Sequence, residues 1–228
     1  MSGIKVSGPE RNLCGRGDPQ VPNVYAGYEQ LARATREEVD YRRELRRTNS
    51  GVAHIAVHGG GIEAGTAEAA DAVAATNGQD YYAFVGLRGT RNNELHITSV
   101  HFDEPMCVAL QLASRRTVSY HGCVGAAPII HLGGGDRELK KRVGQALAEA
   151  GFAVDWHTAE DLDGSDRRNI CNRNASGAGL QLELSAGLRA SFFPGGRTSR
   201  AARESGARTE IFHRFVTALA PAVAEEGP

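Results

Sequence analysis

A histidine that ends an apolar segment, followed by three glycines and a glutamate, is the most chemically suggestive part of this sequence. The run VAHIAVHGGGIEAGTAE over 52–68 places His58 at the end of the apolar stretch and Glu63 five residues later, across the glycines at 59–61. Imidazole nitrogen and carboxylate oxygen are both good ligands for Zn²⁺. Glycines let the backbone reverse sharply, so the two side chains can face one point. The run therefore predicts a metal site at the end of a strand.

The same glycine loop has two other interpretations. A glycine-rich turn between a strand and a helix can bind phosphate through backbone N–H groups at the start of the helix. However, HGGGIEAGT has neither the G-x-G-x-x-G nor the G-x-x-x-x-G-K-[ST] spacing of nucleotide-binding loops, and Glu63 would repel a phosphate. The loop can also be a purely structural turn. We favour the metal site and keep an anion-binding loop as the alternative.

Two further candidates lie in predicted strands. His121 ends the segment TVSYHGC and is again followed by glycine, and Glu183 lies between two leucines in GLQLELS. In an open α/β sheet, ligands bind beyond the carboxyl ends of the strands. His58, Glu63 and His121 would supply three ligands and leave a fourth position for water, which is typical of catalytic zinc. Glu183 would be the separate carboxylate that takes a proton from the water and returns it to the leaving amine.

Each of these residues also has an ordinary structural interpretation. A lone histidine at a strand end is more often a hydrogen-bonded structural residue than a ligand. Glu183 would also fit the solvent-facing side of a half-buried strand. His54 lies in the same strand as His58, and this even spacing would put both on one face. The metal hypothesis therefore depends on the conjunction of two histidines and two carboxylates at strand ends and glycine loops.

Hydrophobic periodicity predicts the elements that would position these residues. Alternation and β-branched or aromatic content predict strands, whereas a 3.6-residue period with Gly or Pro at the ends predicts helices. The predicted strands are 41–47, 52–58, 80–87, 117–121, 129–132, 152–156 and 180–184, and 92–99 is a loop that leads into a further strand. The predicted helices are 25–35, 66–75 with Thr66 as N-cap, 104–113, 137–150 and 200–220.

Strands that alternate with helices predict an α/β domain with a largely parallel sheet between helix layers. Residues 1–23 show no periodicity and are predicted to be a flexible N-terminal arm, which leaves 24–228 as the single domain. The polar stretch 157–179 is longer than a plain connection, and long ordered loops often carry function.

Composition narrows the classes of partner. Of 228 residues, 26 are Lys or Arg and 27 are Asp or Glu, so no basic excess points to nucleic acid. No run approaches the ~18 apolar residues of a membrane helix, and the first residues lack a signal-like apolar segment. We expect a cytoplasmic monomer without nucleic-acid or membrane partners. The four cysteines lack C-x-x-C spacing and are predicted to be free thiols.

Six motifs, in their order along the chain, resemble the phage-type poly-γ-glutamate hydrolase family: HGGGIEAGT, LHITSVHFDEP, SYHGC, HLGGGD, NICNRN and GLQLELSAGLR. The similarity covers about residues 22–215, and this set of motifs is specific. The family also includes a bacterial protein once labelled replication-related. The resemblance implies a small relative of the zinc carboxypeptidases, with a mixed α/β sheet and one catalytic zinc.

The resemblance implies roles for the candidate residues. His58 and Glu63 would be the first ligands, and His121 the third, since SYHGC looks like the carboxypeptidase strand that supplies the last histidine. Glu183 in QLELS resembles the carboxypeptidase general base. The chain departs from ordinary carboxypeptidases in one respect, because their first pair is spaced H-x-x-E and this one is H-x-x-x-x-E.

Two other histidines compete for the third ligand position. His96 and His101 both lie in LHITSVHFDEP. We rank His121 first because it closes a buried strand next to a glycine. We expect His96 and His101 to line the cleft, to orient a ligand or to contact substrate carboxylates.

A polyglutamate substrate carries one carboxylate per residue, and its recognition needs cations. Arginine suits carboxylates because its planar fork binds them in a bidentate manner. The candidates for substrate binding are Arg88, Arg91, Arg168, Asn169, Asn172, Arg173 and Arg189. The predicted function is a zinc amidohydrolase that cleaves γ-glutamyl amide bonds through a metal-activated water, and the alternative is a non-catalytic nucleotide- or anion-binding module that uses the glycine loop.

Overall fold

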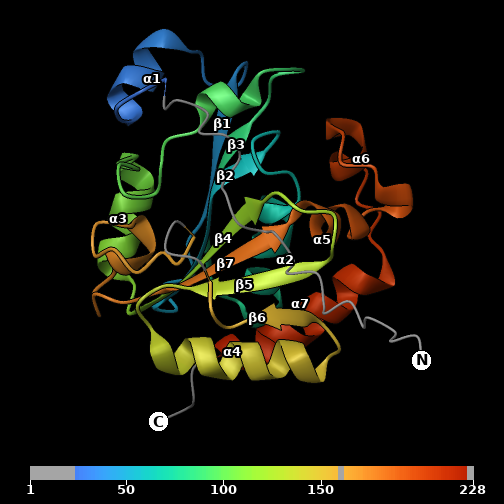
Figure 1. The fold of residues 1–228 in the computed structure, drawn as a ribbon. Helices are drawn as coiled ribbons and strands as arrows, with labels where there is room; N and C mark the ends of the chain where they lie inside the picture. Colours follow the sequence, from blue (N-terminus) through green and yellow to red (C-terminus); the bar gives the residue numbers. More distant parts are fainter. Residues whose placement is uncertain (1–23, 159–161, 225–228) are drawn as a thin grey trace, which may run out of the picture.

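A seven-stranded mixed sheet runs through the centre of the structure, with the strand order β1-β3-β2-β4-β7-β5-β6 (Figure 1). This computed structural model describes residues 24–158 and 162–224, so the predicted arm over 1–23 lies outside the described residues. The strands are β1 (Tyr41–Arg46), β2 (Val52–Gly60), β3 (Asp80–Gly86), β4 (Arg116–Cys123), β5 (Ile129–Gly133), β6 (Ala153–Asp155) and β7 (Leu180–Ser185). Only β1–β3 and β5–β7 pair antiparallel among these strands. The predicted α/β class with a mixed, mostly parallel sheet is confirmed.

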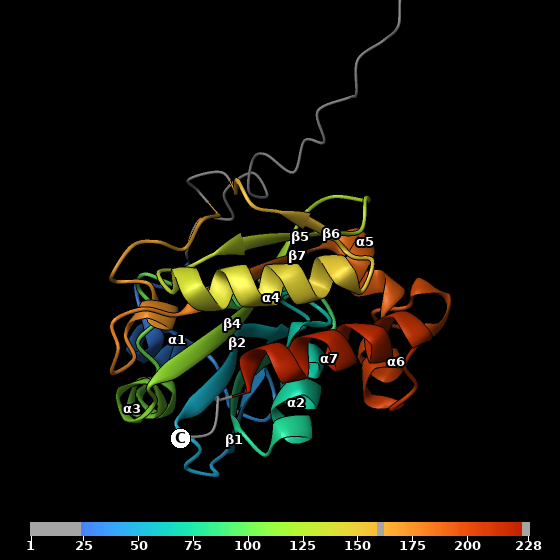
Figure 2. The same cartoon turned by 90° about the horizontal axis from the view of Figure 1, so that it is seen from below.

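Helices cover both faces of this sheet. The helices are α1 (Tyr28–Ala34), α2 (Thr66–Asn77), α3 (Pro105–Ala113), α4 (Arg137–Glu149), α5 (Ala186–Ser191), α6 (Arg200–Glu204) and α7 (Glu210–Val223), with 3₁₀ turns η1 (Asn92–Leu95), η2 (Ile170–Asn172) and η3 (Pro194–Gly196). One hydrophobic cluster joins the sheet to α2, α4 and α7, which lie together in Figure 2. A second cluster joins the opposite face to α1 and α3.

The topology creates a natural site between β2 and β4. These strands are parallel neighbours, so their carboxyl ends meet at the same edge of the sheet. From β2 the chain passes through α2 to β3 on one side, whereas β4 leads toward β5 on the other side. Ligand sites of open α/β sheets lie at such a switch point, where connections leave in opposite directions.

An extra residue in β2 changes the direction in which His58 points. Ala56 pairs with Ala83 and Gly59 with Val85, so three steps along β2 match two steps along β3. Such a bulge reverses the alternation of side chains that follow it. His54 therefore lies on the face covered by α2, where its ring contacts Gln79. His58 lies on the other face, where its ring contacts the carbonyl of Ile97. The prediction that both histidines share a face was wrong because periodicity cannot reveal an inserted residue.

Four local predictions differ from the structure. Gly65, with a φ of 101°, is the N-cap of α2, and Thr66 is its first helical residue. Residues 92–99 form the turn η1 and an irregular segment rather than a strand. The predicted helix over 200–220 is divided into α6 and α7, because Thr209 caps a new helix after an intervening break. The short helix α5 after β7 had not been predicted.

Two expectations from composition can be compared with the described part of the chain. Cys107 and Cys171 are buried free thiols, as predicted, and Cys123 is also buried. Cys14 lies outside the described residues. No helix in the described ranges is long and apolar enough to cross a membrane.

We expect His54 to make the stability of the fold depend on pH. Burial lowers the pKa of His54 to about 4 from its usual 6.5, and the ring bonds to Tyr120 and Gln79. The neutral ring therefore stabilises the fold fully above pH 6.5, and this contribution is lost as the pH falls toward 4. Between pH 7 and pH 5 the free energy of unfolding should fall by about 2 kcal/mol more in the wild type than in a His54→Gln variant. Urea unfolding in the presence of chelator at both pH values measures this difference in free energy. Equal losses in the two proteins would contradict the proposed role of His54.

Candidate metal centre

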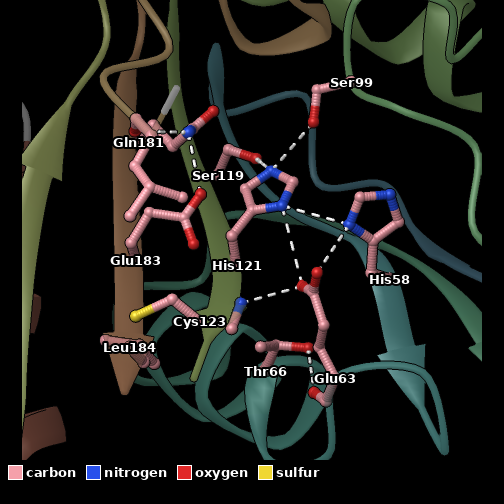
Figure 3. A network of polar contacts seen from close by, with 12 residues as sticks. His58, Glu63, Thr66, Ser99, Ser119, His121, Cys123, Gln181, Glu183 and Leu184 are labelled. Atoms are coloured by element: carbon pink, nitrogen blue, oxygen red, sulfur yellow. Dashed lines mark hydrogen bonds and ion pairs between the residues drawn. The ribbon is translucent and has the colours of Figure 1, made fainter. Parts of the chain in front are cut away.

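The structure brings His58, Glu63 and His121 together at the carboxyl ends of β2 and β4 (Figure 3). His58 Nδ1 lies 3.0 Å from Glu63 Oε1 and 3.2 Å from His121 Nδ1. His121 Nδ1 lies 3.7 Å from Glu63 Oε2. Both rings are buried, and one ligand atom from each of the three residues lies within 4.8 Å of the others. These three residues are the ligand set expected from the sequence.

Hydrogen bonds behind the histidines orient their Nδ1 atoms toward the shared point. His58 Nε2 lies 2.8 Å from the carbonyl oxygen of Ile97, which can only accept, so Nε2 is the donor and Nδ1 is the atom that faces Glu63 and His121. His121 Nε2 contacts the hydroxyls of Ser119 at 2.9 Å and Ser99 at 3.4 Å. Ligating histidines usually have such a partner on the second ring nitrogen.

The spacing of the three groups fits a tetrahedral metal ion. Two atoms that each lie about 2.05 Å from a tetrahedral zinc are about 3.3 Å apart. The observed Nδ1–Nδ1 separation of 3.2 Å is close to that edge. Two imidazole nitrogens and a carboxylate that converge on one point repel each other unless a proton or a cation lies between them. The donor set therefore fits Zn²⁺ in both chemistry and distance.

The loop after β2 places Glu63 by backbone hydrogen bonds. Glu63 N donates to the carbonyl of His58 at 2.8 Å, and Glu63 Oε2 accepts from Gly122 N at 2.8 Å. Gly60 has a φ of 69°, and a Cβ there would lie 2.5 Å from a backbone oxygen, so only glycine fits this turn. Burial alone would raise the pKa of Glu63, but the charge and hydrogen bonds of His58 and His121 hold that pKa well below its usual range.

The same hydrogen bonds disfavour the anion-binding interpretation of the loop. Gly61 N donates to the carbonyl of Gly86 at 2.9 Å, and Glu63 N donates to His58 as described. Gly65 N faces the carboxylate of Glu68 at 3.2 Å. A phosphate cradle needs such N–H groups to point at the ligand. Here they are bonded within the protein, and Glu63 adds a negative charge.

Glu183 lies beside this centre on the next strand. It pairs in register with His121, so both side chains project from the same face of neighbouring strands, about 4.8 Å apart in backbone spacing (Figure 3). Gln181 Nε2 donates to Glu183 Oε1 at 2.9 Å. Burial, reinforced by the negative charge of Glu63, raises the pKa of Glu183 well above its usual range. A carboxyl group whose pKa is raised holds a proton more readily, which suits a group that must accept a proton and return it.

The two competing histidines occupy different environments. The His96 ring stacks on that of His58 with a centroid distance of 4.0 Å. The charge on His58, together with burial, lowers the pKa of His96 to about 3. His101 is exposed. His96 therefore lies against His58, and neither His96 nor His101 belongs to the group of three described residues whose possible ligand atoms converge.

The candidate arginines of 88–91 and 168 interact with acidic neighbours. Arg88 bonds to Asp40 and Glu94, and Arg91 pairs with the same Glu94. Arg168 is paired with Asp166. These pairs give each guanidinium a partner within the protein, so binding of a substrate carboxylate by these arginines would compete with an existing ion pair.

The remaining substrate-binding candidates lie in or beside η2 and in α5. Asn169 Nδ2 donates to Gln181, and Asn172 bonds only to backbone groups, which include Gly135 N and Gly164 O. Arg173 Nη1 donates to the carbonyl of Phe102 at 3.0 Å. Arg189 binds three backbone carbonyls. Asn169 and Asn172 thus organise the loop before β7.

Several residues that support the centre were not among the predicted site residues. Ser119 and Gln181 each lie two positions before a predicted residue of the same strand, so strand periodicity puts them on the same face and could have identified them. The Ile97 carbonyl and the Gly122 amide act through the backbone. No side-chain pattern in the sequence indicates such backbone groups.

Comparisons with known proteins agree with this architecture. A family model for poly-gamma-glutamate hydrolase matches residues 25–218. The SPbeta prophage-derived protein YoqZ of Bacillus subtilis (strain 168) is 35% identical over 166 residues, which cover 72% of this chain but only 59% of YoqZ. The chain thus spans less than two thirds of that relative.

Two solved structures share the fold. The structure of a bacteriophage poly-gamma-glutamate hydrolase superposes with a TM-score of 0.85 at 35% identity and covers 88% of this chain and 96% of its own. The apo, zinc-free structure of YndL gives a TM-score of 0.81 at 31% identity, with 89% and 98% covered. Since the family model spans most of the sequence and these structures match nearly all of the described fold, the chain belongs to the poly-γ-glutamate hydrolase family.

Proposed function

We propose that this protein is a zinc-dependent amidohydrolase that cleaves γ-glutamyl amide bonds. The observation that carries the proposal is the convergence of two histidine Nδ1 atoms and one carboxylate at a separation that fits tetrahedral zinc. A related structure, that of YndL, is described as zinc-free, and another is that of a poly-gamma-glutamate hydrolase. Both descriptions support the proposed metal and substrate class.

His58, Glu63 and His121 would hold the ion, and three protein ligands leave one position open for substrate or water. When bound, zinc would supply a Lewis acid for the amide carbonyl and a positive charge that lowers the pKa of the Glu183 carboxyl. The buried rings and their hydrogen bonds to Ile97 and Ser119 keep the ligands in position before substrate arrives.

Glu183 would transfer the proton of the reaction. Amide hydrolysis needs one group to accept a proton from the attacking water and to return it to the leaving nitrogen. Gln181 fixes one oxygen of Glu183, so the other oxygen is the one available for this transfer. The burial that raises the pKa of Glu183 also favours the protonated form that must donate to the nitrogen.

A panel of substrates tests this function. Three oligomers should be assayed: γ-linked glutamate, α-linked glutamate, and a neutral γ-linked chain whose α-carboxyl groups are amidated. Each is assayed with protein that contains zinc and with chelator-treated protein. We expect cleavage of the γ-linked glutamate oligomers, its loss with chelator, and its recovery when zinc is returned. Equal activity with and without chelator, or no cleavage of any γ-linked chain, would contradict the proposal.

Arg173 is the arginine that we expect to contribute most to binding an acidic substrate. It is half-buried beside η2, whose Ile170 N donates to the carbonyl of Ser99, and Ser99 contacts His121. Arg173→Ala should raise KM for a polyanionic γ-glutamyl chain more than for a neutral analogue, with a smaller effect on kcat. Steady-state kinetics with Arg33→Ala as the control measures this difference, because Arg33 is an exposed arginine on α1 that pairs with Glu29. Equal changes in KM for both substrates would show that Arg173 only supports the loop.

A further inference from the structure

The side chain of Arg189 connects three segments at the metal centre. Arg189 lies in α5, directly after β7, and its guanidinium turns back toward the sheet. Nε donates to the carbonyl of Leu184 at 2.9 Å, Nη1 to that of Ala64 at 2.8 Å, and Nη2 to that of Cys123 at 3.2 Å. A planar guanidinium presents its donors in a fixed fork, so three such bonds fix the relative positions of three backbones.

The three carbonyls have a common feature. Each belongs to a residue close after one of the candidate site residues. Leu184 follows Glu183 on β7, Ala64 follows Glu63 in the glycine loop, and Cys123 lies two positions after His121 on β4. The loop that carries Glu63 has no strand pairing of its own beyond Gly60. The orientation of Glu63 therefore depends on hydrogen bonds of this kind.

A glycine allows Arg189 to approach β4 closely. A Cβ atom at Gly122 would lie 2.6 Å from Arg189 Cζ and 2.6 Å from Nε, so any larger residue would displace the guanidinium. Gly122 N donates to Glu63 Oε2 at 2.8 Å. The same glycine thus contacts the metal-binding carboxylate through its N–H group and the guanidinium through its open side.

We propose that Arg189 is a positioning residue that joins the Glu63 loop to β4 and β7 and so pre-forms the metal centre. This inference rests on the proposed zinc function and replaces substrate binding as the role of Arg189. Loss of the side chain leaves three carbonyls without their donor and lets the loop move relative to the two strands. Supporting residues of this kind change metal affinity by about 10- to 100-fold.

Hydrogen exchange in the metal-free protein tests the connection without zinc. In Arg189→Ala, the Gly122 amide should exchange at least about tenfold faster than in the wild type, because the loop that carries its acceptor is released. Arg142→Ala is the matched control, since Arg142 on α4 is a half-buried arginine whose Nε donates to the carbonyl of Ala222 on α7 at 2.6 Å, away from the Glu63 loop. Exchange at Gly122 should stay at its wild-type rate in that control.

Zinc competition with a chromophoric chelator gives the second readout. Arg189→Ala should weaken zinc binding about tenfold or more, Arg189→Lys should weaken it less because an ammonium can reach one carbonyl at a time, and free guanidinium ion should partly restore the alanine variant. If Arg189→Ala fails to fold, Gly122→Ala serves in its place, because its Cβ displaces the same guanidinium.

The outcomes separate this inference from the proposed function. Wild-type exchange at Gly122 together with wild-type zinc affinity in Arg189→Ala would overturn the role of Arg189 and leave the zinc hydrolase intact. An increase in KM for acidic substrates alone, with zinc affinity unchanged, would assign Arg189 to substrate binding instead. A wild-type protein that binds no zinc would contradict the proposed function, while the exchange experiment would still decide whether Arg189 holds the loop.

Discussion

Replacement of Glu183 by glutamine should abolish most of the turnover while the protein keeps its fold and its zinc. Glutamine preserves the size of the side chain and can still contact Gln181, but it cannot accept a proton. A positioned acid–base group contributes a factor on the order of 10² to 10⁴ to the rate. We therefore expect kcat to fall about 100-fold or more with little change in KM, as measured by steady-state kinetics on a γ-linked glutamate oligomer.

A second buried carboxylate provides the control for this variant. Glu104 is fully buried at the start of α3, where it bonds to Arg43 and to Cys107 N. Glu104→Gln should lower stability and leave the turnover of folded, zinc-loaded enzyme near the wild-type value. A folded Glu183→Gln protein with full zinc and near wild-type activity would show that Glu183 is only a strand residue.

Replacement of both His58 and His121 by alanine should remove the bound metal. The two rings supply two of the three ligands, and Glu63 alone in a loop cannot hold zinc against water. We expect zinc to fall from about one ion per chain to a trace, as measured by elemental analysis of protein purified without added metal. His54→Gln is the matched control, because His54 is a buried histidine of the same strand that bonds to Tyr120 and Gln79 instead. Full zinc occupancy in the double variant would place the metal elsewhere.

The convergence of His58, Glu63 and His121 could be predicted because parallel strands bring distant residues to one edge. His58 and His121 end neighbouring strands, and the glycine loop gives Glu63 the freedom to turn back. The position of Glu183 beside His121 could be predicted in the same way, because the two residues lie on neighbouring parallel strands. These inferences needed only strand ends and side-chain alternation, and neither depends on details of packing.

Other features depend on contacts that no local pattern contains. The bulge in β2, which separates the directions of His54 and His58, appears only in the register against β3. Arg88 is neutralised by Asp40, 48 positions away in the sequence, so its charge looked available when it was not. The division between α6 and α7 is different, because Thr209 is a recognisable N-cap that the apolar periodicity on either side concealed.

Diffraction from crystals of the zinc-loaded protein, measured on both sides of the zinc absorption edge, would locate the metal ion relative to the side chains of His58, Glu63 and His121. We expect one anomalous peak per chain, about 2.0–2.2 Å from His58 Nδ1, His121 Nδ1 and a carboxylate oxygen of Glu63, with Glu183 beside the peak but not bound to it. A zinc-loaded crystal whose strongest peak lies away from these three atoms, or whose histidines coordinate through Nε2, would contradict it.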